Sequence, residues 1–504
     1  MTTTAADVLV PVDEERHRAA AAEFLPRMTV LIGAEEHEHG SDGEFEHVNA
    51  ATGRVQARVP LAGADEVDRA VEAARAASAV WRGWRPDERR NVLLRLAGLI
   101  RRQTESIAQV LTLECGSPIT GSRAMPGRAA DYLEYYAGLA DKLEGRVVPI
   151  FPEKAFDYTL PEPYGVIGVI STWNGGISSV ARKAGAALAA GNTVVVKPME
   201  LAPFSSLIFG RLALEAGFPE GVVNIVPGAV AAGEALVAHP GVDKLSFTGG
   251  IDAARAILVG AARNITPVVL ELGGKSGNLV FPDADLDAAG LFAGGVCMRN
   301  SGQGCVMPTR LLVHEDVHDE VLERAVRAIG AMPLGDPLDP RTQIGPVVSR
   351  PHAERILRLI READEEEAGR RILGGGRVGD KGLRDGHFVE PTVFDGVDPR
   401  SAIARTEVFG PVLTVTAFRD EAEAVALAND TPYGLAGYVH TRDLQRAHRV
   451  AASLDAGYVS VNGFAALPAA APFGGFRDSG YGKEGGREGI AEFLRSKNVY
   501  VPIG

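Results

Sequence analysis

Cys305 is the residue whose surroundings most suggest chemistry. It closes the stretch Asn300-Ser301-Gly302-Gln303-Gly304-Cys305, at the expected end of a helix, where small and flexible neighbours would leave a thiol open to a substrate. Cys115 and Cys297 have more apolar neighbours, as inert core cysteines do. Because a thiolate adds readily to carbonyl carbon, Cys305 is either a nucleophile or a third inert thiol, and its local sequence leaves both open.

Glu271 and Asn174 each follow an apolar run. Glu271 ends Val268-Val269-Leu270-Glu271, where burial would raise the pKa of its carboxyl as a general base requires; a structural ion pair is the alternative. Asn174 follows the predicted strand 166–171, and its side-chain amide could donate to an oxyanion. A turn or a helix cap is an equally compatible role for this asparagine.

Lys197 and Glu200 come directly after the predicted strand 193–196. Ligands of doubly wound sheets bind beyond the carboxyl ends of strands, so this pair could hold a ribose, although a solvated loop is the alternative. A carboxylate there would repel a 2′-phosphate, which favours NAD over NADP. The short loop Thr248-Gly249-Gly250 joins a strand to a helix and suits a phosphate at the helix N-terminus.

Two glycine-rich stretches match the dinucleotide pattern GxGxxG literally. They are 374–379 and 480–485, and neither has the preceding strand and following helix that the motif requires. Both are therefore predicted to be glycine turns. The P-loop pattern GxxxxGK[ST] does not occur.

The pattern of apolar residues predicts an α/β protein. Strands at 166–171, 193–196, 222–226, 244–247 and 268–272 alternate with helices such as 205–216 and 252–262. A second alternation has strands at 278–281 and 310–313 with helices at 286–299 and 318–329. Such alternation predicts mostly parallel sheets with helices on both faces, here in two domains.

The chain before residue 163 has a different character. Helical patterns begin at Ala64 and Asp87 and cover 132–142, whereas the first 55 residues look polar and irregular except for a helix at 14–24. The segment 148–160 is extended and interrupted by prolines, which predicts a strand arm.

Composition narrows the classes of function. The 504 residues include 52 basic and 65 acidic ones, a net charge of −13, which argues against nucleic acid and anionic membranes as partners. No apolar run of about 18 residues and no signal-peptide pattern occur. Three cysteines provide neither a disulfide framework nor a CxxC metal site. We expect a soluble, cytoplasmic protein without a metal.

Seven motifs in this order resemble the aldehyde dehydrogenase superfamily, in its NAD(P)-dependent, non-acylating form. The likeness runs from about Asn49 to the C-terminus. The motifs are Trp173-Asn174, Lys197-Pro198-Met199-Glu200, Phe247-Thr248-Gly249, Glu271-Leu272-Gly273-Gly274-Lys275, Gly302-Gln303-Gly304-Cys305, Glu407-Val408-Phe409-Gly410-Pro411 and Pro472-Phe473-Gly474-Gly475.

The resemblance implies an architecture. A Rossmann-like NAD-binding domain would comprise 1–143 and 163–273, and an α/β catalytic domain would comprise 274–480. A small β arm for oligomerisation would comprise 144–162 and 488–504. Members of the superfamily are typically homodimers or homotetramers in which these arms pair across subunits.

The resemblance also implies a role for each site residue. Cys305 would add to the aldehyde to form a thiohemiacetal, with its backbone N–H and Asn174 holding the oxyanion. After hydride transfer to NAD, Glu271 would activate the water that hydrolyses the thioester to the carboxylic acid. The residues implied to hold NAD are Lys197 and Glu200 at the adenosine ribose, Glu407 and Phe409 at the nicotinamide ribose and ring, and Trp173, Thr248, Gly249 and Gly250 elsewhere.

This chain departs from the family pattern at two glycines of the cofactor loops. Gly176 stands where proline is usual, and Gly250 stands where serine is usual. Both departures concern the rigidity of these loops rather than the chemistry.

Small and apolar residues around the reacting groups predict a roomy pocket for a bulky or apolar aldehyde. The residues expected there are Gly175, Gly304, Ala465, Ala466, Leu467 and Phe473. By resemblance, Arg128 and Arg182 could also face this pocket and select a carboxylated semialdehyde. Solvent exposure or ion pairing of the two arginines is the alternative.

Three other functions are alternatives to a hydrolytic aldehyde dehydrogenase. A CoA-acylating relative would pass the acyl group to CoA, but such enzymes commonly lack the base that Glu271 provides. A cysteine hydrolase would need a partner histidine, and none of the eleven lies in a supporting motif. A non-catalytic member would have no need of Cys305, Glu271 and Asn174 together.

Overall fold

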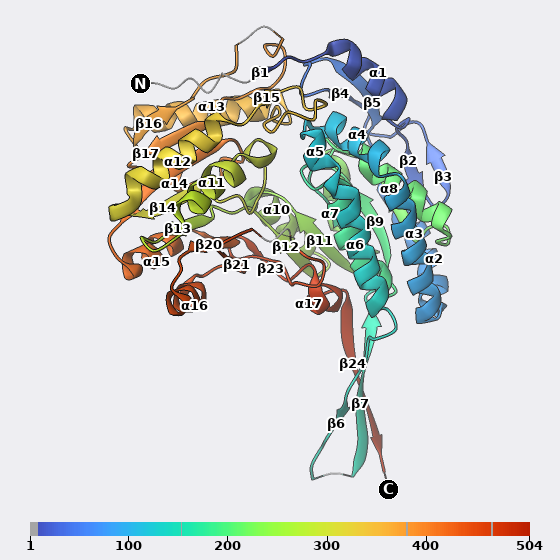
Figure 1. Ribbon diagram of the computed structural model, residues 1–504. Helices are drawn as coiled ribbons and strands as arrows, with labels where there is room; N and C mark the ends of the chain where they lie inside the picture. Colours follow the sequence, from blue (N-terminus) through green and yellow to red (C-terminus); the bar gives the residue numbers. More distant parts are fainter. Residues whose placement is uncertain (1–8, 153, 380–381, 465–466, 504) are drawn as a thin grey trace.

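The computed structural model describes residues 9–152, 154–379, 382–464 and 467–503. Two helix-covered sheets form the body of the molecule, and a narrow β arm projects from it (Figure 1). The predicted α/β fold class is therefore confirmed. In the described part of the chain, no helix has both the length and the apolar character needed to cross a membrane.

The first sheet has eight strands in the order β23-β12-β11-β8-β9-β10-β2-β3. The five strands in its middle are parallel, and they are those predicted between residues 166 and 272. The strands are β2 (Val30–Ile32), β3 (Glu35–His37), β8 (Val166–Ile170), β9 (Thr193–Lys197), β10 (Val223–Ile225), β11 (Lys244–Thr248), β12 (Val268–Glu271) and β23 (Gly480–Tyr481).

Alternating residues of this sheet enter two hydrophobic cores. In β9, Val194 and Val196 pack with one group of helices, whereas Val195 packs with the other. Because successive side chains of a strand point to opposite faces and both faces of this sheet are buried, the strands appear in the sequence as unbroken apolar runs. The first group comprises α3 (Pro86–Arg102), α4 (Thr104–Cys115), α6 (Ala124–Leu139), α7 (Gly176–Ala189) and α8 (Phe204–Ala216); the second comprises α2 (Ala64–Gly83), α9 (Val230–Ala238) and α10 (Ile251–Ala262).

The N-terminal 55 residues are more regular than predicted. The helix at 14–24 is confirmed as α1 (Glu14–Phe24), but strands occur where irregular chain was expected. Leu31 of β2 pairs antiparallel with Ile225 and so extends the first sheet. An apolar run of three residues is too short to signal a strand, which is why the prediction was wrong. The other elements here are β1 (Leu9–Val10), β4 (Glu44–Val48) and β5 (Val55–Pro60).

The second sheet has seven strands in the order β16-β17-β18-β14-β13-β20-β21, parallel except for β16. Val280 and Val313 face a core with α11 (Leu286–Cys297) and α12 (His318–Gly330), whereas Leu279 and Leu312 face a core with α15 (Glu421–Asn429) and α16 (Leu444–Ser453). The strands are β13 (Gly277–Val280), β14 (Arg310–His314), β16 (Arg370–Leu373), β17 (Thr392–Asp395), β18 (Val412–Phe418), β20 (Ala436–His440) and β21 (Tyr458–Val461).

The remaining elements are short or connect the sheets. β1 pairs with β15 (Leu334–Gly335), β4 with β5, and β19 (Tyr433–Gly434) with β22 (Phe476–Arg477). The other helices are α5 (Ile119–Ser122), α13 (Arg350–Glu365), α14 (Ala402–Arg405) and α17 (Gly486–Ala491), together with 3-10 turns at Arg299–Gly302 and Glu315–Val317.

Neither GxGxxG match stands between a parallel strand and a helix as a dinucleotide motif does: the first is irregular chain, and the second runs from an edge strand to the start of α17 at Gly486. The first follows β16, an antiparallel edge strand, and leads into a bridge between Arg377 and Val389 rather than a helix. The second begins in β23, a two-residue antiparallel strand beside β12. Gly374, Gly375, Gly480, Gly482 and Gly485 all have positive φ, which a turn needs and glycine tolerates best.

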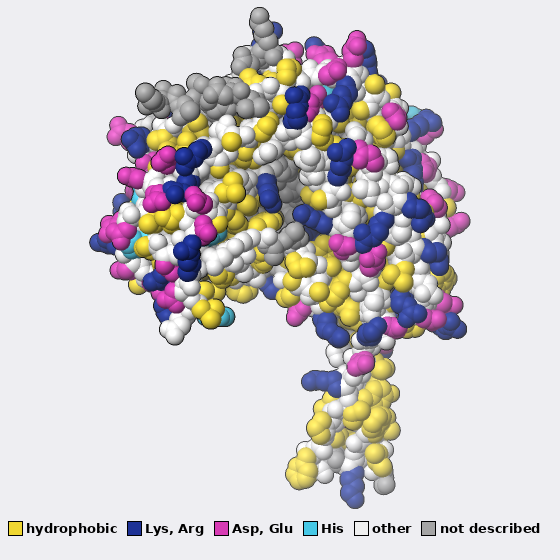
Figure 2. Space-filling model, in the orientation of Figure 1, with side chains coloured by type: hydrophobic (Ala, Val, Ile, Leu, Met, Phe, Trp, Pro, Cys, Tyr) yellow, Lys and Arg dark blue, Asp and Glu magenta, His cyan; other side chains and the backbone are white. Residues whose placement is uncertain are grey.

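The arm joins two segments far apart in the chain. β24 (Leu494–Pro502) pairs antiparallel with the whole of β7 (Ala155–Pro163), and β6 (Val147–Val148) adds a third strand. Hydrophobic side chains gather along this projection in Figure 2. The exposed ones are Val147, Phe151, Phe156, Leu160, Tyr500, Val501 and Ile503.

Candidate active site

A cavity of about 830 Å³ lies beyond the carboxyl ends of β8, β9 and β11, between α9 and α10. This is the edge at which ligands bind in doubly wound sheets. Six of the residues predicted to hold the cofactor line this one cavity although they come from three separate loops: Trp173, Lys197, Glu200, Thr248, Gly249 and Gly250.

The cavity presents groups suited to a ribose and to an anion. Lys197 ends β9 and is buried; burial lowers the pKa of its amine, while the nearby Glu200 carboxylate opposes that shift. α10 begins after Gly250 without a side-chain cap, so its first N–H groups stay free for phosphate oxygens. The Thr248 hydroxyl is buried without a hydrogen-bond partner among the described residues. A dinucleotide fits this set of donors and acceptors.

Gly250 has open space around its α-carbon. A Cβ at Gly250 would meet no atom within 4 Å, whereas one at Gly249 would collide with the Phe247 ring at 2.2 Å. Gly176 is required for a different reason: its φ is +45°, and a Cβ would lie 2.3 Å from Leu111. Proline needs φ near −65°, so this backbone excludes proline at position 176.

Glu407 and Phe409 lie outside the lining of that cavity but adjoin its Trp173 side. The Trp173 and Phe409 rings meet edge to face at 5.4 Å. Phe409 has a φ of +55°, and His352 Nε2 donates to its carbonyl at 2.7 Å. Glu407 accepts a hydrogen bond from the Gly274 N–H at 2.9 Å, and burial raises the pKa of its carboxyl to about 7.

Two residues that fix this loop carry no motif and were not predicted. Arg355 donates to the carbonyls of Val408 and Glu407, and His352 holds Phe409 as described. Both come from α13, so the loop at 407–409 is held by a helix about 50 residues earlier in the chain. The one signal in the sequence for His352 and Arg355 is their spacing of three residues, which places both side chains on the same face of a helix.

Cys305 follows a strained turn rather than a helix end. α11 ends at Cys297, and Asn300, Ser301 and Gly302 then adopt left-handed backbone conformations. A Cβ at Gly302 would lie 2.0 Å from the Gly410 carbonyl oxygen, so the turn packs directly on the loop that carries Phe409. The expectation of a helix terminus at Cys305 was wrong, because two consecutive non-glycine left-handed residues end the helical path.

The buried Gln303 side chain locks the turn in place. Its amide donates to the Asn300 carbonyl at 3.0 Å, and its Oε1 accepts from the Val348 N–H at 2.9 Å. Asn174 Nδ2 donates to the Gln303 carbonyl at 3.2 Å, while Thr172 donates to Asn174 Oδ1 at 2.7 Å. The Asn174 amide is thus oriented with its N–H₂ toward the chain two residues before Cys305.

The Glu271 carboxyl lies close enough to the Cys305 thiol to affect the pKa of that thiol. Burial, with Glu407 and Glu271 adding repulsion, raises the pKa of Cys305 to about 12. Glu271 ends β12, and burial together with the Glu484 charge raises the pKa of its carboxyl well above the usual range. Neither Glu271 oxygen has a hydrogen-bond partner among the described residues. A neutral thiol beside an unpaired carboxyl is an arrangement in which the carboxyl can act as a base.

Arg182 is paired rather than free to bind a substrate anion. Its Nε lies 2.5 Å from Glu484 Oε2, and its guanidinium lies over the rings of Tyr132 and Phe473. Lys183 binds the other Glu484 oxygen at 2.5 Å. The sequence did not reveal this network because its partners are about 300 residues apart. Arg128 of α6 is half-buried and has no hydrogen bond or ion pair with the described residues.

An apolar group of residues surrounds the half-buried Cys305. Leu467 and Phe473, both predicted, belong to it, and Tyr132 donates to the Leu467 carbonyl at 3.1 Å. Ala465 and Ala466 lie outside the described residues. The members that were not predicted are Phe292, Val296, Val306, Met307, Leu435, Ala436, Tyr438, Tyr458 and Phe464.

Gly175 and Gly304 do not enlarge this pocket by themselves. A Cβ at Gly175 would meet Ser179 at 2.6 Å, and one at Gly304 would meet Met307 at 2.6 Å. Both glycines are therefore explained by the packing of neighbouring side chains.

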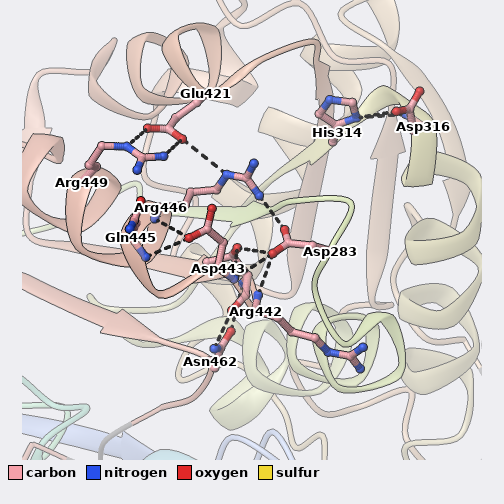
Figure 3. A network of polar contacts seen from close by, with 11 residues as sticks. Asp283, His314, Asp316, Glu421, Arg442, Asp443, Gln445, Arg446, Arg449 and Asn462 are labelled. Atoms are coloured by element: carbon pink, nitrogen blue, oxygen red, sulfur yellow. Dashed lines mark hydrogen bonds and ion pairs between the residues drawn. The ribbon is translucent and has the colours of Figure 1, made fainter.

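A polar network anchors the chain that leads into the pocket wall (Figure 3). Asn462 follows β21 with a φ of +54° and makes two hydrogen bonds to the backbone of Thr441. The Thr441 hydroxyl donates to Asp283, which also accepts from Arg446 at 2.7 Å. These contacts fix the start of the segment that continues to Phe464.

Comparison with known proteins gives a consistent result. The model of the family described as "Aldehyde dehydrogenase family" matches residues 37–499. An aldehyde dehydrogenase of Enchytraeus buchholzi is 41% identical over 466 residues, which are 91% of this chain and 92% of that protein.

Solved structures of two other proteins are similar to this one over nearly the full length of the chain. A crystal structure of PnpE in complex with nicotinamide adenine dinucleotide is 38% identical with a TM-score of 0.93, covering 95% of this chain and 98% of that one. Betaine aldehyde dehydrogenase of Staphylococcus aureus in complex with NAD⁺ is 34% identical with a TM-score of 0.93, covering 96% and 97%.

Proposed function

We propose, from the premise that this chain belongs to the aldehyde dehydrogenase family, that it oxidises an aldehyde to the carboxylic acid with NAD and releases the product by hydrolysis. The observation that carries the proposal is the adjacency of two sites. Trp173 lines the cavity that contains Lys197 and Glu200, its ring contacts the Phe409 ring, and the loop of Phe409 packs on the turn before Cys305. The NAD complexes of the two solved relatives support the choice of cofactor.

Each residue of the site has a chemical task in this proposal. The Cys305 thiol loses its proton to water, and its sulfur adds to the aldehyde carbon to form a thiohemiacetal. Asn174 Nδ2 and the Cys305 N–H donate to the carbonyl oxygen as it becomes negative. Bound NAD would supply the hydride acceptor, and loss of the hydride from that carbon would leave a thioester on Cys305. Glu271 then removes a proton from the water that hydrolyses the thioester.

Protein groups account for how the cofactor would be held. Glu200 and Lys197 would bind the adenosine ribose, and the N-terminus of α10 with Thr248, Gly249 and Gly250 would bind the phosphates. Glu407 would hold the nicotinamide ribose, with Phe409 and Trp173 packing beside the ring. The test is NADH formation, followed by absorbance, across neutral short-chain, medium-chain, cyclic and carboxylated aldehydes.

We infer a bulky or apolar aldehyde as substrate. Cys305 lies among aromatic and aliphatic side chains, and Arg182, which could have selected a carboxylate, already pairs with Glu484. A carboxylated semialdehyde stays as the second candidate because Arg128 has no partner among the described residues. A higher kcat/KM for acetaldehyde than for cyclic and medium-chain aldehydes would overturn the first candidate.

Removing the Glu200 charge should shift the preference between cofactors. In Glu200→Gln the ribose loses a charged acceptor, so we expect the KM for NAD to rise about tenfold. The kcat/KM for NADP should rise about tenfold because the 2′-phosphate no longer meets a carboxylate. Steady-state kinetics with both cofactors measure this. Glu234→Gln, in an exposed residue of the same cavity wall, should leave the ratio unchanged; a wild-type protein that favours NADP would contradict the assignment.

We propose that the chain divides into a cofactor-binding domain and a catalytic domain, each built on one of the two large sheets. Core strands up to Glu271 belong to the first sheet, and those from Gly277 to Val461 belong to the second. This supports cofactor-binding residues 1–143 and 163–273 and catalytic residues 274–480. β23 returns to the first sheet at that last boundary.

The arm of 144–162 and 488–504 should hold a homodimer or homotetramer together. Phe156 and Val501 are cross-strand partners and are 45% and 44% exposed, which is typical of an interface. The double variant Phe156→Glu with Val501→Lys keeps an attractive pair across the strands but makes the face polar. We expect its particle mass, by light scattering after size exclusion, to fall to half or to one subunit.

The control for the arm is Leu444→Lys, which removes a 71% exposed leucine from α16, away from the arm. It should keep the wild-type mass. A wild-type protein that is already monomeric, or a double variant of unchanged mass, would show that the arm has another role.

A further inference from the structure

A chain of polar side chains runs through the N-terminal part of the protein and ends under the loop that carries Glu200. Its five members come from four separate segments, and all except Gln56 are buried. In order they are Asp336, His17 of α1, Asn49, Gln56 of β5 and His47 of β4, and the last contact is the backbone carbonyl of Leu201.

The backbone around Asn49 determines the direction of every hydrogen bond in this chain. Asn49 Oδ1 accepts from the N–H groups of Ala51 and Thr52, so its Nδ2 must be the donor to His17 Nδ1 and Gln56 Oε1. Gln56 then has only Nε2 left to donate, and it does so to His47 Nδ1 at 3.1 Å and to the Leu113 carbonyl at 2.7 Å.

Both histidines are therefore neutral with the proton on Nε2. His47 Nε2–H donates to the Leu201 carbonyl at 3.0 Å, and burial lowers the pKa of His47 to about 4, in agreement with a neutral ring. At the other end His17 Nε2–H donates to Asp336 Oδ1 at 2.8 Å.

The far end of the chain is tied to the side of the second sheet. Asp336 also accepts from the N–H groups of Asp13 and Leu338, and it follows β15, which pairs with β1. The N-terminal segment is thus attached at Asp336 and reaches across to the cofactor loop.

The near end fixes the one loop that connects β9 to α8. Leu201 is the neighbour of Glu200, and the Ala202 N–H donates to the Met199 carbonyl in a tight turn. Glu114 accepts from the Ser205 N–H at 3.1 Å and holds the start of α8. His47 comes from outside this loop, and its hydrogen bond to the Leu201 carbonyl is made at the residue next to Glu200.

We propose that His47 is a positioning residue for the cofactor: it holds the Leu201 carbonyl and so sets the place of the Glu200 carboxylate against the adenosine ribose. This rests on the proposed function, in which Glu200 binds NAD. His47 touches neither the reacting atoms nor the ribose, so its effect should appear in NAD affinity and not in the chemical steps at Cys305.

Three substitutions test this. His47→Leu removes the donor, and we expect the KM and the Kd for NAD to rise about five- to tenfold while kcat at saturating NAD stays within about twofold. His47→Gln can place an amide near the position of Nε2 and should restore the wild-type Kd to within about twofold. Gln56→Met breaks the chain one step earlier and should raise the Kd for NAD about threefold.

The readouts are NAD titration by calorimetry and steady-state kinetics on the full-length protein, with melting temperatures recorded alongside. His448→Leu, in an exposed histidine of α16, is the matched control and should change neither constant. If His47→Leu does not fold, Gln56→Met compared with the wild type decides the outcome.

The inference is overturned if His47→Leu binds NAD as the wild type does, if His47→Gln is as impaired as His47→Leu, or if kcat falls with KM unchanged. A wild-type protein that binds no NAD would overturn the proposed function and this inference with it. Normal NAD binding by the wild type with unaltered variants would overturn the inference alone.

Discussion

Cys305→Ala should form NADH from aldehydes at a rate reduced about 10⁴-fold or more. The sulfur forms the only covalent bond to the substrate in the proposed reaction, and without it the carbon that gives up hydride never becomes tetrahedral. NAD affinity should stay within about twofold, because Lys197, Glu200 and the N-terminus of α10 do not depend on the thiol.

The measurement combines NADH formation with NAD titration on the same preparation. Cys297→Ala is the matched control: it also removes a thiol but in a core position with no exposure, so it should lower the melting temperature and leave turnover intact. Substantial turnover by Cys305→Ala, or equal losses in both variants, would contradict the assignment of Cys305 as nucleophile.

Sequence patterns located the parts of the site that lie at the ends of regular elements. Lys197 and Glu271 end the buried strands β9 and β12, and a fully buried strand is readable because its apolar run is continuous. The loop 248–250 stands between a strand and a helix, as predicted. Parallel pairing then brings these strand ends to one edge, although they are far apart in the sequence.

What escaped prediction depends on contacts between distant segments. Glu484 meets Lys183 across about 300 residues, and Asp336 meets His17 across 319. Phe409 and Ser301 have left-handed backbones imposed by packing, for which neither residue has an intrinsic preference. A single sequence carries no local signal for such pairs, so the electrostatics of Glu271 and the anchoring of the Glu200 loop emerged only from the three-dimensional arrangement.

Glu271→Gln should separate the two halves of the reaction. Glutamine keeps the shape of the side chain but cannot accept a proton from water, so the thioester on Cys305 should accumulate. We expect a rapid burst of about one NADH per active subunit, followed by a steady rate lower by about 10²- to 10³-fold. Rapid-mixing absorbance and the intact mass of the acylated protein record these two events.

The pH dependence should distinguish a base from a residue that only fills space. Burial and the Glu484 charge raise the pKa of the Glu271 carboxyl, and only the deprotonated form is a base. The steady rate of the wild type should therefore rise with pH until that pKa is passed and then level off. In Glu271→Gln this rise should vanish, whereas Glu234→Gln should keep it.

The acceptor of the acyl group decides between hydrolysis and the CoA-acylating alternative. With Glu271 unpaired beside Cys305, water activated by the carboxylate should release the free acid from the wild type even when CoA is present. Acyl-CoA as the main product would contradict that reading. Turnover of Glu271→Gln at the wild-type rate with no burst would show that another group serves as the base, and Glu484 would be the next carboxylate to examine, since its charge acts on Glu271.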